Sequence, residues 1–444
     1  MSRRKRKGKS GKTISLVLIA LILSGGFFMA GVTFAGLQQQ PVYPLSITQQ
    51  VADGEPDIVV PSLPSWVFAV YAWYQNVHPI VSEYDYIIGN SGSTYIAYFG
   101  VNSTVAYSGT NATTIIQSCI NQNSSIFMRS GIYPLETTLD FSDTNSSLTG
   151  SGFDKTILQY NGTIIKIAHS NGASYFDNEI SNLDLDGVGK AGYGIQISNL
   201  KMSQFSDIYI HNCNIGIYMR NQTLENIFVN IWIYECNIGV KMLNYDNAGG
   251  ENYHVDYNKF YGGRVQSCTV VNINITGNCE HNTFDSMLIA GNDYDTSMVY
   301  IAAILNTGET AVLNPLFTTF INCWFEVTST ADGDTMIYVT SLWSGNANYT
   351  TFGLLIDDCS FHTPCNITFI HIHSGYKTII TNNRFYVALQ NNIGTIQLDA
   401  NTGGNYGAYC TILTNNVGWS KETGSTLTLT DNGHYTVTDN NIWD

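Results

Sequence analysis

Short runs of alternating apolar and polar residues recur through the second half of the chain. Two of them match closely at a spacing of 23 residues, namely 207–217 (DIYIHNCNIGI) and 230–240 (NIWIYECNIGV). Alternation with a period of two is typical of a β-strand that buries one face. A repeat of about 20 to 50 residues predicts a solenoid, in which each repeat packs on its neighbours.

The cysteine of this motif marks one position in every repeat. The aligned residues are Val188, Cys213, Cys236, Cys268, Asn292, Cys323, Cys359, Asn383, Asn416 and Asn440. The residue three positions earlier is always apolar, and the residue directly before is polar or glycine. The intervals leave no room for helices, so the pattern predicts an all-β parallel β-helix of at least ten coils. The cysteines and asparagines are expected to form one buried ladder at one corner, with asparagine amides bonded along the stack.

The residues four and two positions before the aligned residue are expected to face outward in the predicted coils. They are Asp184 with Asp186, Tyr209 with His211, Trp232 with Tyr234, and Arg264 with Gln266. Later repeats carry blander pairs, such as Thr319 with Ile321, Ile379 with Thr381 and Ile412 with Thr414, which we expect to be covered or inert. Aromatic rings beside charged groups suit sugars. The predicted glycan-binding residues are Tyr209, His211, Trp232, Tyr234 and Arg264. The alternative is that loops such as 244–256 fold over these rings as a second small core.

The N-terminal part divides into three segments before the repeats. Residues 1–36 combine a basic tip with a long uncharged run, which favours a transmembrane anchor with the bulk of the chain extracellular. A cleaved signal peptide, giving a secreted protein, is the alternative. Residues 37–64 are interpreted as a linker, and 65–83 as an apolar helical cap on the first coil or an interfacial element. The β-helix domain is expected over 84–444.

Nine Asn-x-Ser/Thr sequons are compatible with glycosylation on an outer face. They are Asn102, Asn111, Asn123, Asn145, Asn161, Asn221, Asn274, Asn348 and Asn366. Five of the nine cysteines, namely Cys213, Cys236, Cys268, Cys323 and Cys359, are explained by the repeat as small buried side chains. Candidate disulfides are Cys213–Cys236, Cys359–Cys365 and Cys268–Cys279.

The charge distribution argues against nucleic-acid partners. Of the 19 basic residues, seven lie within the first twelve positions, so the remaining chain has 12 basic against 34 acidic residues and a net charge of −22. Binding to phosphate backbones requires basic clusters that this body lacks.

The segment from Tyr84 to Tyr160 has a pattern of its own. An amphipathic helix is predicted over 110–120, and it is followed by the runs 126–134 (IFMRSGIYP) and 148–158 (LTGSGFDKTIL). This order resembles the N-terminal module of the pectate-lyase-like superfamily of right-handed parallel β-helices. That group includes polysaccharide lyases, polygalacturonases and phage tailspikes. The resemblance extends to the C-terminus and implies the fold more specifically than any chemistry.

Candidate chemistry is sparse. Asp357-Asp358-Cys359 resembles one polygalacturonase motif, but the companion motifs are absent, and Asp358 falls at the corner position, where a structural turn residue explains it. Lyases of the superfamily pair a calcium-binding carboxylate cluster with a basic proton acceptor, for which Asp184, Asp186 and Arg264 are weak candidates. Otherwise no cofactor is required. No metal site is predicted, because Cys-x-x-Cys and His-x-x-x-His spacings are missing, and His371 with His373 is interpreted as a solvated surface pair.

Three functions follow from these patterns. The leading one is a cell-surface β-helix protein that binds or displays glycans, as an adhesin or envelope component. The first alternative is a polysaccharide lyase or glycoside hydrolase acting on an acidic polysaccharide. The second is a structural stalk or array subunit that forms homo-oligomers through the uncapped end at Trp443 and Asp444.

Overall fold

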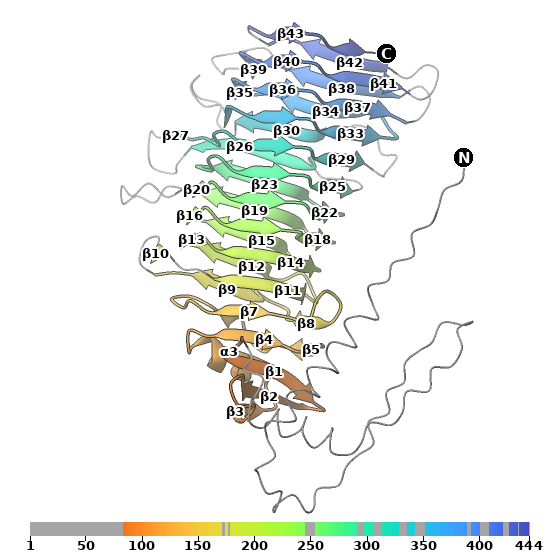
Figure 1. Ribbon diagram of the computed structural model, residues 1–444. Helices are drawn as coiled ribbons and strands as arrows, with labels where there is room; N and C mark the ends of the chain where they lie inside the picture. The colour runs from red at the N-terminus through yellow and green to blue at the C-terminus, as the bar shows by residue number, and fades with distance from the viewer. Residues whose placement is uncertain are drawn as a thin grey trace, which may run out of the picture. The chain divides into compact units, whose positions relative to one another are not determined.

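The computed structural model describes residues 83–443, apart from 171–173, 176–177, 245–253, 292–296, 306–311, 328–334, 342–350, 389–391, 400–407, 421–425 and 434. The chain winds into successive coils, each packed on the one before (Figure 1). The predicted anchor, linker and most of the capping segment lie outside the described residues. Within the described ranges, no helix is both long and apolar enough to cross a membrane.

Each complete coil contributes two strand segments to one large sheet and a third strand to a second sheet, and the coils pair in parallel. The first column consists of β4 (Ser125–Met128), β7 (Ser147–Thr149), β11 (Glu179–Asp186), β14 (Gln204–His211), β17 (Ile227–Val229), β21 (Lys259–Tyr261), β24 (Thr283–Asp285), β28 (Thr319–Ile321), β32 (Leu355–Asp357), β36 (Ile379–Thr381), β40 (Ile412–Thr414) and β43 (Val437–Asp439). The second column consists of β5 (Gly131–Pro134), β8 (Thr156–Gln159), the C-terminal halves of β11 and β14, β18 (Trp232–Tyr234), β22 (Arg264–Gln266), β25 (Leu288–Gly291), β29 (Trp324–Val327), β33 (Ser360–Thr363), β37 (Arg384–Val387), β41 (Val417–Ser420) and β44 (Ile442–Trp443). These pairings confirm a parallel β-helix of at least ten coils. Its right hand stays a prediction.

The third strands form the second sheet. They are β6 (Leu139–Asp140), β9 (Ile165–Ala168), β12 (Tyr193–Ser198), β15 (Ile215–Arg220), β19 (Ile238–Asn244), β23 (Val271–Gly277), β26 (Val299–Leu305), β30 (Thr335–Ser341), β34 (Ile367–Ile372), β38 (Ile393–Leu398) and β42 (Thr426–Asp431), with β27 (Val312–Leu313) antiparallel to β26. Two small sheets occupy a corner, namely β10 (Ser174–Tyr175), β13 (Leu200–Lys201), β16 (Thr223–Leu224) and β20 (Val255–Asp256), and β31 (Thr351–Phe352), β35 (Gly375–Tyr376) and β39 (Ala408–Tyr409).

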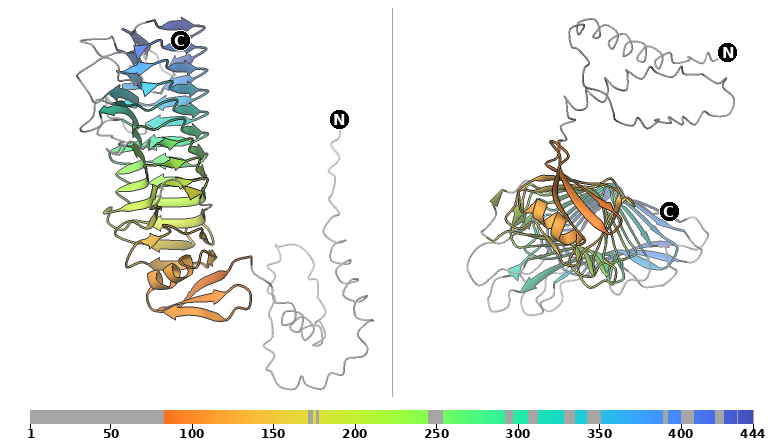
Figure 2. Two further views of the ribbon diagram at one scale, coloured as in Figure 1. Left: turned by 90° about the vertical axis from the view of Figure 1, so that its left-hand side faces the viewer. Right: turned by 90° about the horizontal axis from the view of Figure 1, so that it is seen from below.

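The N-terminal end of the stack carries an antiparallel meander and a helix. The meander is β1 (Tyr86–Ser91), β2 (Thr94–Phe99) and β3 (Val105–Gly109), and β1 also pairs in parallel with β4. Helix α3 (Ala112–Ile120) begins at Asn111, whose side chain accepts a hydrogen bond from the Thr114 amide. The predicted helix over 110–120 is thus confirmed. Together these elements lie across the end of the coils (Figure 2).

Stacked phenylalanines fill much of the core. The first column contributes Phe205, Phe228, Phe260, Phe284 and Phe320, with successive ring centres 4.3 to 5.0 Å apart. The second column contributes Phe325, Phe361 and Phe385 at 4.7 and 4.8 Å. All eight are essentially inaccessible to solvent. Parallel stacking places like residues one coil apart, so offset ring stacking adds to the burial of apolar area.

Polar residues with positive φ join the two columns in many of the coils, and Gly262 and Gly263 do so between β21 and β22. Asn182, Asn230, Asn322, Asn382 and Asn415 all have φ between 51° and 57°. Asparagine adopts the left-handed region more readily than most residues, because its short side chain bonds locally. The abundance of asparagine in the chain is in part a consequence of this recurring kink.

The predicted single ladder at one corner is wrong, because two corners share the same chemistry. Strand pairing aligns Phe320 with Phe284, whereas Ile289 aligns with Phe325. Cys213, Cys236 and Cys268 therefore follow the second column, while Cys323, Cys359, Asn383 and Asn416 lie at the kink between the columns. At both places a left-handed polar residue precedes a small buried one, as Glu235 precedes Cys236 and Asn322 precedes Cys323. A pattern of residue types alone does not separate them.

The asparagine amides do bond along the stack, as predicted. Asn383 donates its amide and its Nδ2 to Asn416 Oδ1, both at 3.0 Å. Asn416 donates in the same way to Asn441 Oδ1, again at 3.0 Å. The last member of the ladder is therefore Asn441 and not Asn440, which adopts the left-handed kink with φ of 52°.

None of the nine cysteines, all of which are described, forms a disulfide. The three candidate disulfide pairs are therefore not formed. Eight of the nine side chains are buried, as expected for small apolar residues, and Cys410 is half-buried.

Candidate functional site

The outward positions of the second column form one continuous strip of side chains, which we call the outer strip. In one row Asp184, Tyr209, Trp232 and Arg264 are paired coil to coil, and in the other row Asp186, His211, Tyr234 and Gln266 are paired in the same way. The register predicted for these eight residues is confirmed. They come together because strand alternation directs both rows to the same face.

Asp184, Asp186 and His211 are closely connected on this strip. His211 Nε2 lies 2.9 Å from Asp184 Oδ1, and His211 Nδ1 lies 3.7 Å from Asp186 Oδ1. Asp184 is only 3% exposed. Asp186 also accepts hydrogen bonds from Gln159 Nε2 at 3.0 Å and Asn212 Nδ2 at 3.1 Å. Both carboxylates are thus engaged by neighbouring side chains.

The His211 ring is held at both nitrogens, because Nε2 lies 2.9 Å from Asp184 Oδ1 and Nδ1 lies 2.8 Å from Asn212 Nδ2. Burial lowers the pKa of His211, but the hydrogen bond and charge of Asp184 and the charge of Asp186 outweigh it, so the pKa is raised. Burial raises the pKa of Asp186, yet hydrogen bonds from Asn212, the Val188 amide and Gln159 bring it below its ordinary value. The arrangement is a charge cluster with a net negative charge.

The two large rings beside this cluster are half-covered. The Arg264 guanidinium lies 4.0 Å from the centre of the Trp232 ring, within the range of a cation–π contact. Phe153, from the turn between β7 and β8, lies 5.3 Å from the Trp232 ring and 6.4 Å from the Tyr209 ring. A loop therefore does pack on these rings, but it is the Phe153 turn. Of the predicted covering loop 244–256, residues 245–253 lie outside the described residues.

The outer strip continues into later coils, contrary to the prediction that they are bland. Trp324 pairs with Leu288 and Ser360, and Glu326 pairs with His362. The residues expected to be inert, such as Thr319 and Ile321, belong to the first column. In these later coils the alignment of the sequence repeats therefore followed the first-column strands and not the second-column strands that form the outer strip.

The aromatic part of these later coils is more accessible than the predicted one. Trp324 is 44% exposed and stacks on His362, with ring centres 4.1 Å apart and planes 12° apart. Tyr386 follows at 5.3 Å from His362. Arg384 is exposed and its Nη2 lies 4.0 Å from Asp358 Oδ1. Sequence reasoning missed these residues, although the correct column would have found them.

The remaining candidate catalytic residues lie elsewhere. Asp358 takes the left-handed kink with φ of 49°, the corner role considered for it. Asp357 accepts a hydrogen bond from Asn382 Nδ2 at 2.8 Å. Pairing of Asp357 with Thr381 and Ile321 places it in the first column. The structure does not bring this pair together with Asp184 and Asp186, which lie several coils away.

Two groups of side chains among the described residues have the composition of a metal site. One is His254, Asp256 and Glu280, and the other is His371, His373 and Asp399, with ligand atoms in each group within 4.8 Å of one another. Burial and the Glu280 charge raise the pKa of Asp256 to about 7, against the opposing effect of His254. Neither group includes Asp184 or Asp186, the residues considered for calcium.

The sequons differ in accessibility. Asn102, Asn123, Asn145 and Asn161 are exposed, whereas Asn111, Asn221, Asn274 and Asn366 are half-buried, and Asn348 lies outside the described residues. Glycosylation at these positions stays a prediction.

Comparison with known proteins identifies similar architectures at low identity. No protein family and no curated protein sequence matches the chain. Among solved structures, it is similar to ORF18 of Geobacillus virus E2 (14% identity, TM-score 0.46, 84% of this chain and 72% of that one). It is also similar to an alginate lyase from a Paenibacillus species (13%, 0.40, 66% and 92%) and to a surface adhesin of Streptococcus pneumoniae (9%, 0.37, 74% and 88%).

Proposed function

We propose that this protein binds a neutral glycan along the outer strip of its β-helix. The observation that carries the proposal is the coil-to-coil pairing of Tyr209, Trp232 and Arg264 on one face. Trp324 extends the same row two coils beyond Arg264. Such a row offers aromatic and hydrogen-bonding groups at successive positions along an extended ligand.

The chemistry of the strip suits sugars. Rings pack against the C–H faces of a pyranose, while guanidinium and amide groups take its hydroxyl groups. The chain after residue 12 carries a net charge of −22, which disfavours an acidic polymer by like-charge repulsion. A neutral polysaccharide or glycoconjugate is therefore the ligand class that the charge balance supports.

Trp324 is the ring best placed to receive a sugar. His362 covers one of its faces, and the side chain is 44% exposed. Trp232, in contrast, is half-buried between Arg264 and Phe153. We expect Trp324 to contribute more of the binding free energy than Trp232.

A panel of neutral and acidic glycans tests the proposal. Trp324→Ala should weaken binding of the best neutral glycan by at least about tenfold, the loss expected for an aromatic contact of about 1.4 kcal/mol. Tyr257→Ala is the matched control, since Tyr257 is 49% exposed at a different corner. Unchanged binding in both Trp324→Ala and Trp232→Ala, or the absence of any bound glycan, would contradict the proposal.

A glycoside hydrolase or polysaccharide lyase is the second candidate, and one observation favours it. Burial and the charge of the neighbouring Glu280 raise the pKa of Asp256 to about 7, and a carboxyl group with a raised pKa is typical of a general acid. Incubation of the full-length protein with neutral and acidic polysaccharides, with and without calcium, should then release reducing ends or unsaturated products. Asp256→Asn should abolish this release. No release from any substrate would exclude catalysis under those conditions.

We propose that the β-helix domain lies on the outer surface of the cell, where it meets neutral polysaccharides or glycoconjugates. The basic and then uncharged segment 1–36 supports export, with anchoring or cleavage as the two outcomes. Protease treatment of intact cells, followed by detection of the β-helix domain, distinguishes an exposed domain from an internal one. Fractionation of medium and membranes then separates the secreted from the anchored form.

A further inference from the structure

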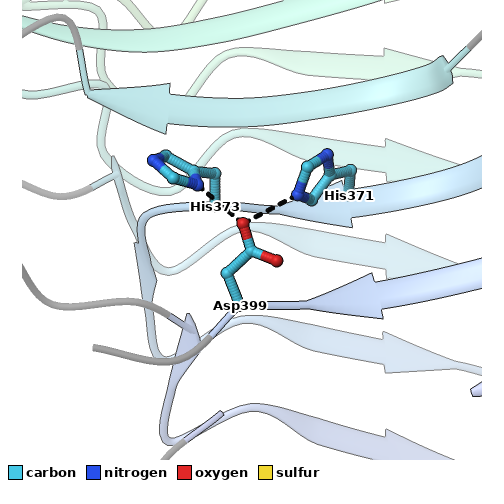
Figure 3. A group of neighbouring side chains, drawn as sticks. All are labelled: His371, His373 and Asp399. Carbon is cyan, nitrogen blue, oxygen red and sulfur yellow. Dashed lines mark hydrogen bonds and ion pairs between the residues drawn. The ribbon is translucent and has the colours of Figure 1, made fainter. Parts of the chain in front are cut away.

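His371, His373 and Asp399 converge on one point at the C-terminal ends of β34 and β38 in the second sheet (Figure 3). Asp399 Oδ2 lies 2.9 Å from His371 Nε2 and 2.6 Å from His373 Nδ1. The three side chains are 19%, 47% and 22% exposed, respectively, so the group is accessible from solvent but partly shielded. One carboxylate oxygen and two imidazole nitrogens thus face each other.

The solenoid brings these residues together from two successive coils. His371 and His373 are two positions apart, at the end of β34, and strand alternation directs both to the same side. Pairing of His371 with Gln397 and of Ile372 with Leu398 places Asp399 beside His373 in the next coil. Local spacing rules miss the site, because its third member comes 26 residues later. The surface pair predicted from sequence is real, but it is incomplete without Asp399.

The backbone around the group is well fixed. The His373 amide donates to Val339 O at 2.8 Å, and the Asp399 amide donates to Ile372 O at 3.1 Å. Gln397 Nε2 donates to Asp399 Oδ1 at 2.9 Å, which orients the carboxylate and leaves Oδ2 directed at the histidines. Outer partners of this kind are typical of metal-binding carboxylates.

We propose that His371, His373 and Asp399 bind a divalent transition-metal ion of the Zn²⁺ class, which links two successive coils. Two imidazoles and one carboxylate are the ligand set of many zinc and other transition-metal sites, whereas calcium prefers oxygen ligands alone. Ligand atoms at about 2.0 to 2.2 Å from a tetrahedral ion are about 3.3 Å apart. The N–O distances of 2.9 and 2.6 Å therefore need to open by only about 0.4 to 0.7 Å.

Binding requires both histidines to be neutral and to direct a lone pair at the ion. The hydrogen bonds to Asp399 are then replaced by metal–ligand bonds, and the proton on His371 Nε2 and on His373 Nδ1 moves through solvent to the other nitrogen of the same ring, so no net proton is released from the neutral group. With the carboxylate ionised and the histidines neutral, the group carries one negative charge and becomes singly positive with the ion bound. Solvent supplies the remaining coordination position on the exposed side, next to His373.

The test measures Zn²⁺ binding to the full-length protein at pH 7.5 by equilibrium dialysis, with Co²⁺ absorption spectra as the probe of ligand geometry. The wild type should bind one more equivalent of Zn²⁺ than Asp399→Asn or His373→Gln. Loss of one ligand should weaken this site by at least about 100-fold. His362→Gln is the matched control, since His362 stacks on Trp324 away from the group. Glu280→Gln separates any binding at the other three-residue group.

Thermal unfolding of each variant without metal shows whether it is folded, and His373→Gln changes the most exposed of the three side chains. Lowering the pH to 5.5 should weaken binding by at least about tenfold, because protons compete for imidazole. Equal Zn²⁺ binding by wild type, Asp399→Asn and His373→Gln would overturn the proposal, as would no Zn²⁺ bound by the wild type. This inference does not depend on the proposed glycan binding.

Discussion

Asn258 is the centre of a buried ladder of asparagine amides, and replacing it with leucine tests how far these amides hold the coils together. Its Oδ1 accepts from the Asn226 amide at 3.1 Å and from Asn226 Nδ2 at 3.0 Å. Its Nδ2 donates to Thr223 O at 2.9 Å and to Asn282 Oδ1 at 3.1 Å. The side chain is 0% exposed, so water does not reach these groups. Leucine has nearly the same shape but makes none of these hydrogen bonds.

The loss of stability expected for Asn258→Leu depends on which neighbouring groups lose their hydrogen-bond partner in the ladder. Asn226 Nδ2 keeps Leu200 O at 3.1 Å, and Asn282 Oδ1 keeps the Asn258 amide at 3.1 Å. The Asn226 amide and Thr223 O are left without the Asn258 side chain. Each buried group without a partner costs about 1 to 3 kcal/mol, so the expected destabilisation is about 4 kcal/mol.

Native-state hydrogen exchange reports this loss locally, which matters because a solenoid need not unfold in one step. A loss of about 4 kcal/mol corresponds to several-hundred-fold faster exchange of the Asn226 amide. Asn214→Ala is the control, since Asn214 is half-buried and accepts one side-chain bond, from Asn237. Its expected cost is about 1 kcal/mol or less. A loss below about 1 kcal/mol in Asn258→Leu would refute the reasoning.

Three further predictions concern other parts of the fold. In the native protein a thiol reagent should modify Cys410 and spare the eight buried cysteines, whereas unfolded protein should react at all nine, as counted by mass spectrometry. Since interaction with Asp184 raises the pKa of His211, its contribution to stability is present below the ordinary histidine pKa of about 6.5 and is lost as pH rises through the raised value. Denaturation from pH 6 to 9 should show this decline, and His211→Gln should flatten it. Gly216→Ala should destabilise the fold by about 2 kcal/mol or more in the same assay, because a Cβ would meet Gly239 O at 2.7 Å.

The parallel β-helix could be predicted because coil stacking repeats the same demands at fixed positions. An inward residue meets its equivalents above and below, so Leu185, Ile210 and Ile233 are all apolar and all buried. The outward register of Tyr209 and Trp232 followed from the same alternation. These features need only strand geometry and burial.

The later register could not be predicted, because residue types do not identify which corner they occupy. Asn322 with Cys323 and Glu235 with Cys236 present the same combination of left-handed polar residue and buried thiol. Only strand pairing separates them, and pairing is a property of the whole coil. The error moved the expected surface from Trp324 to Thr319 and hid the more accessible half of the outer strip.

Contacts between residues of different coils could not be predicted from the spacing of residues within a short motif. Phe153 packs on Trp232 from a turn about 80 residues earlier, and Asp399 joins His371 from the next coil. In a solenoid a site is assembled across coils, so its members are separated by one or more repeat lengths. Searching residues at repeat spacing, in place of motif spacing, would have proposed His371 and Asp399 as neighbours.

The parallel pairing of coils also gives the outward side chains of the outer strip a uniform axial spacing. Asp184 to Tyr209 spans 25 residues and Leu288 to Trp324 spans 36, yet each step advances by one coil, about 4.8 Å. Additional residues lengthen the loops at the corners and leave the axial spacing of the outward side chains unchanged. Insertions and deletions in those loops can therefore alter the surroundings of the outer strip without changing the axial spacing of its side chains.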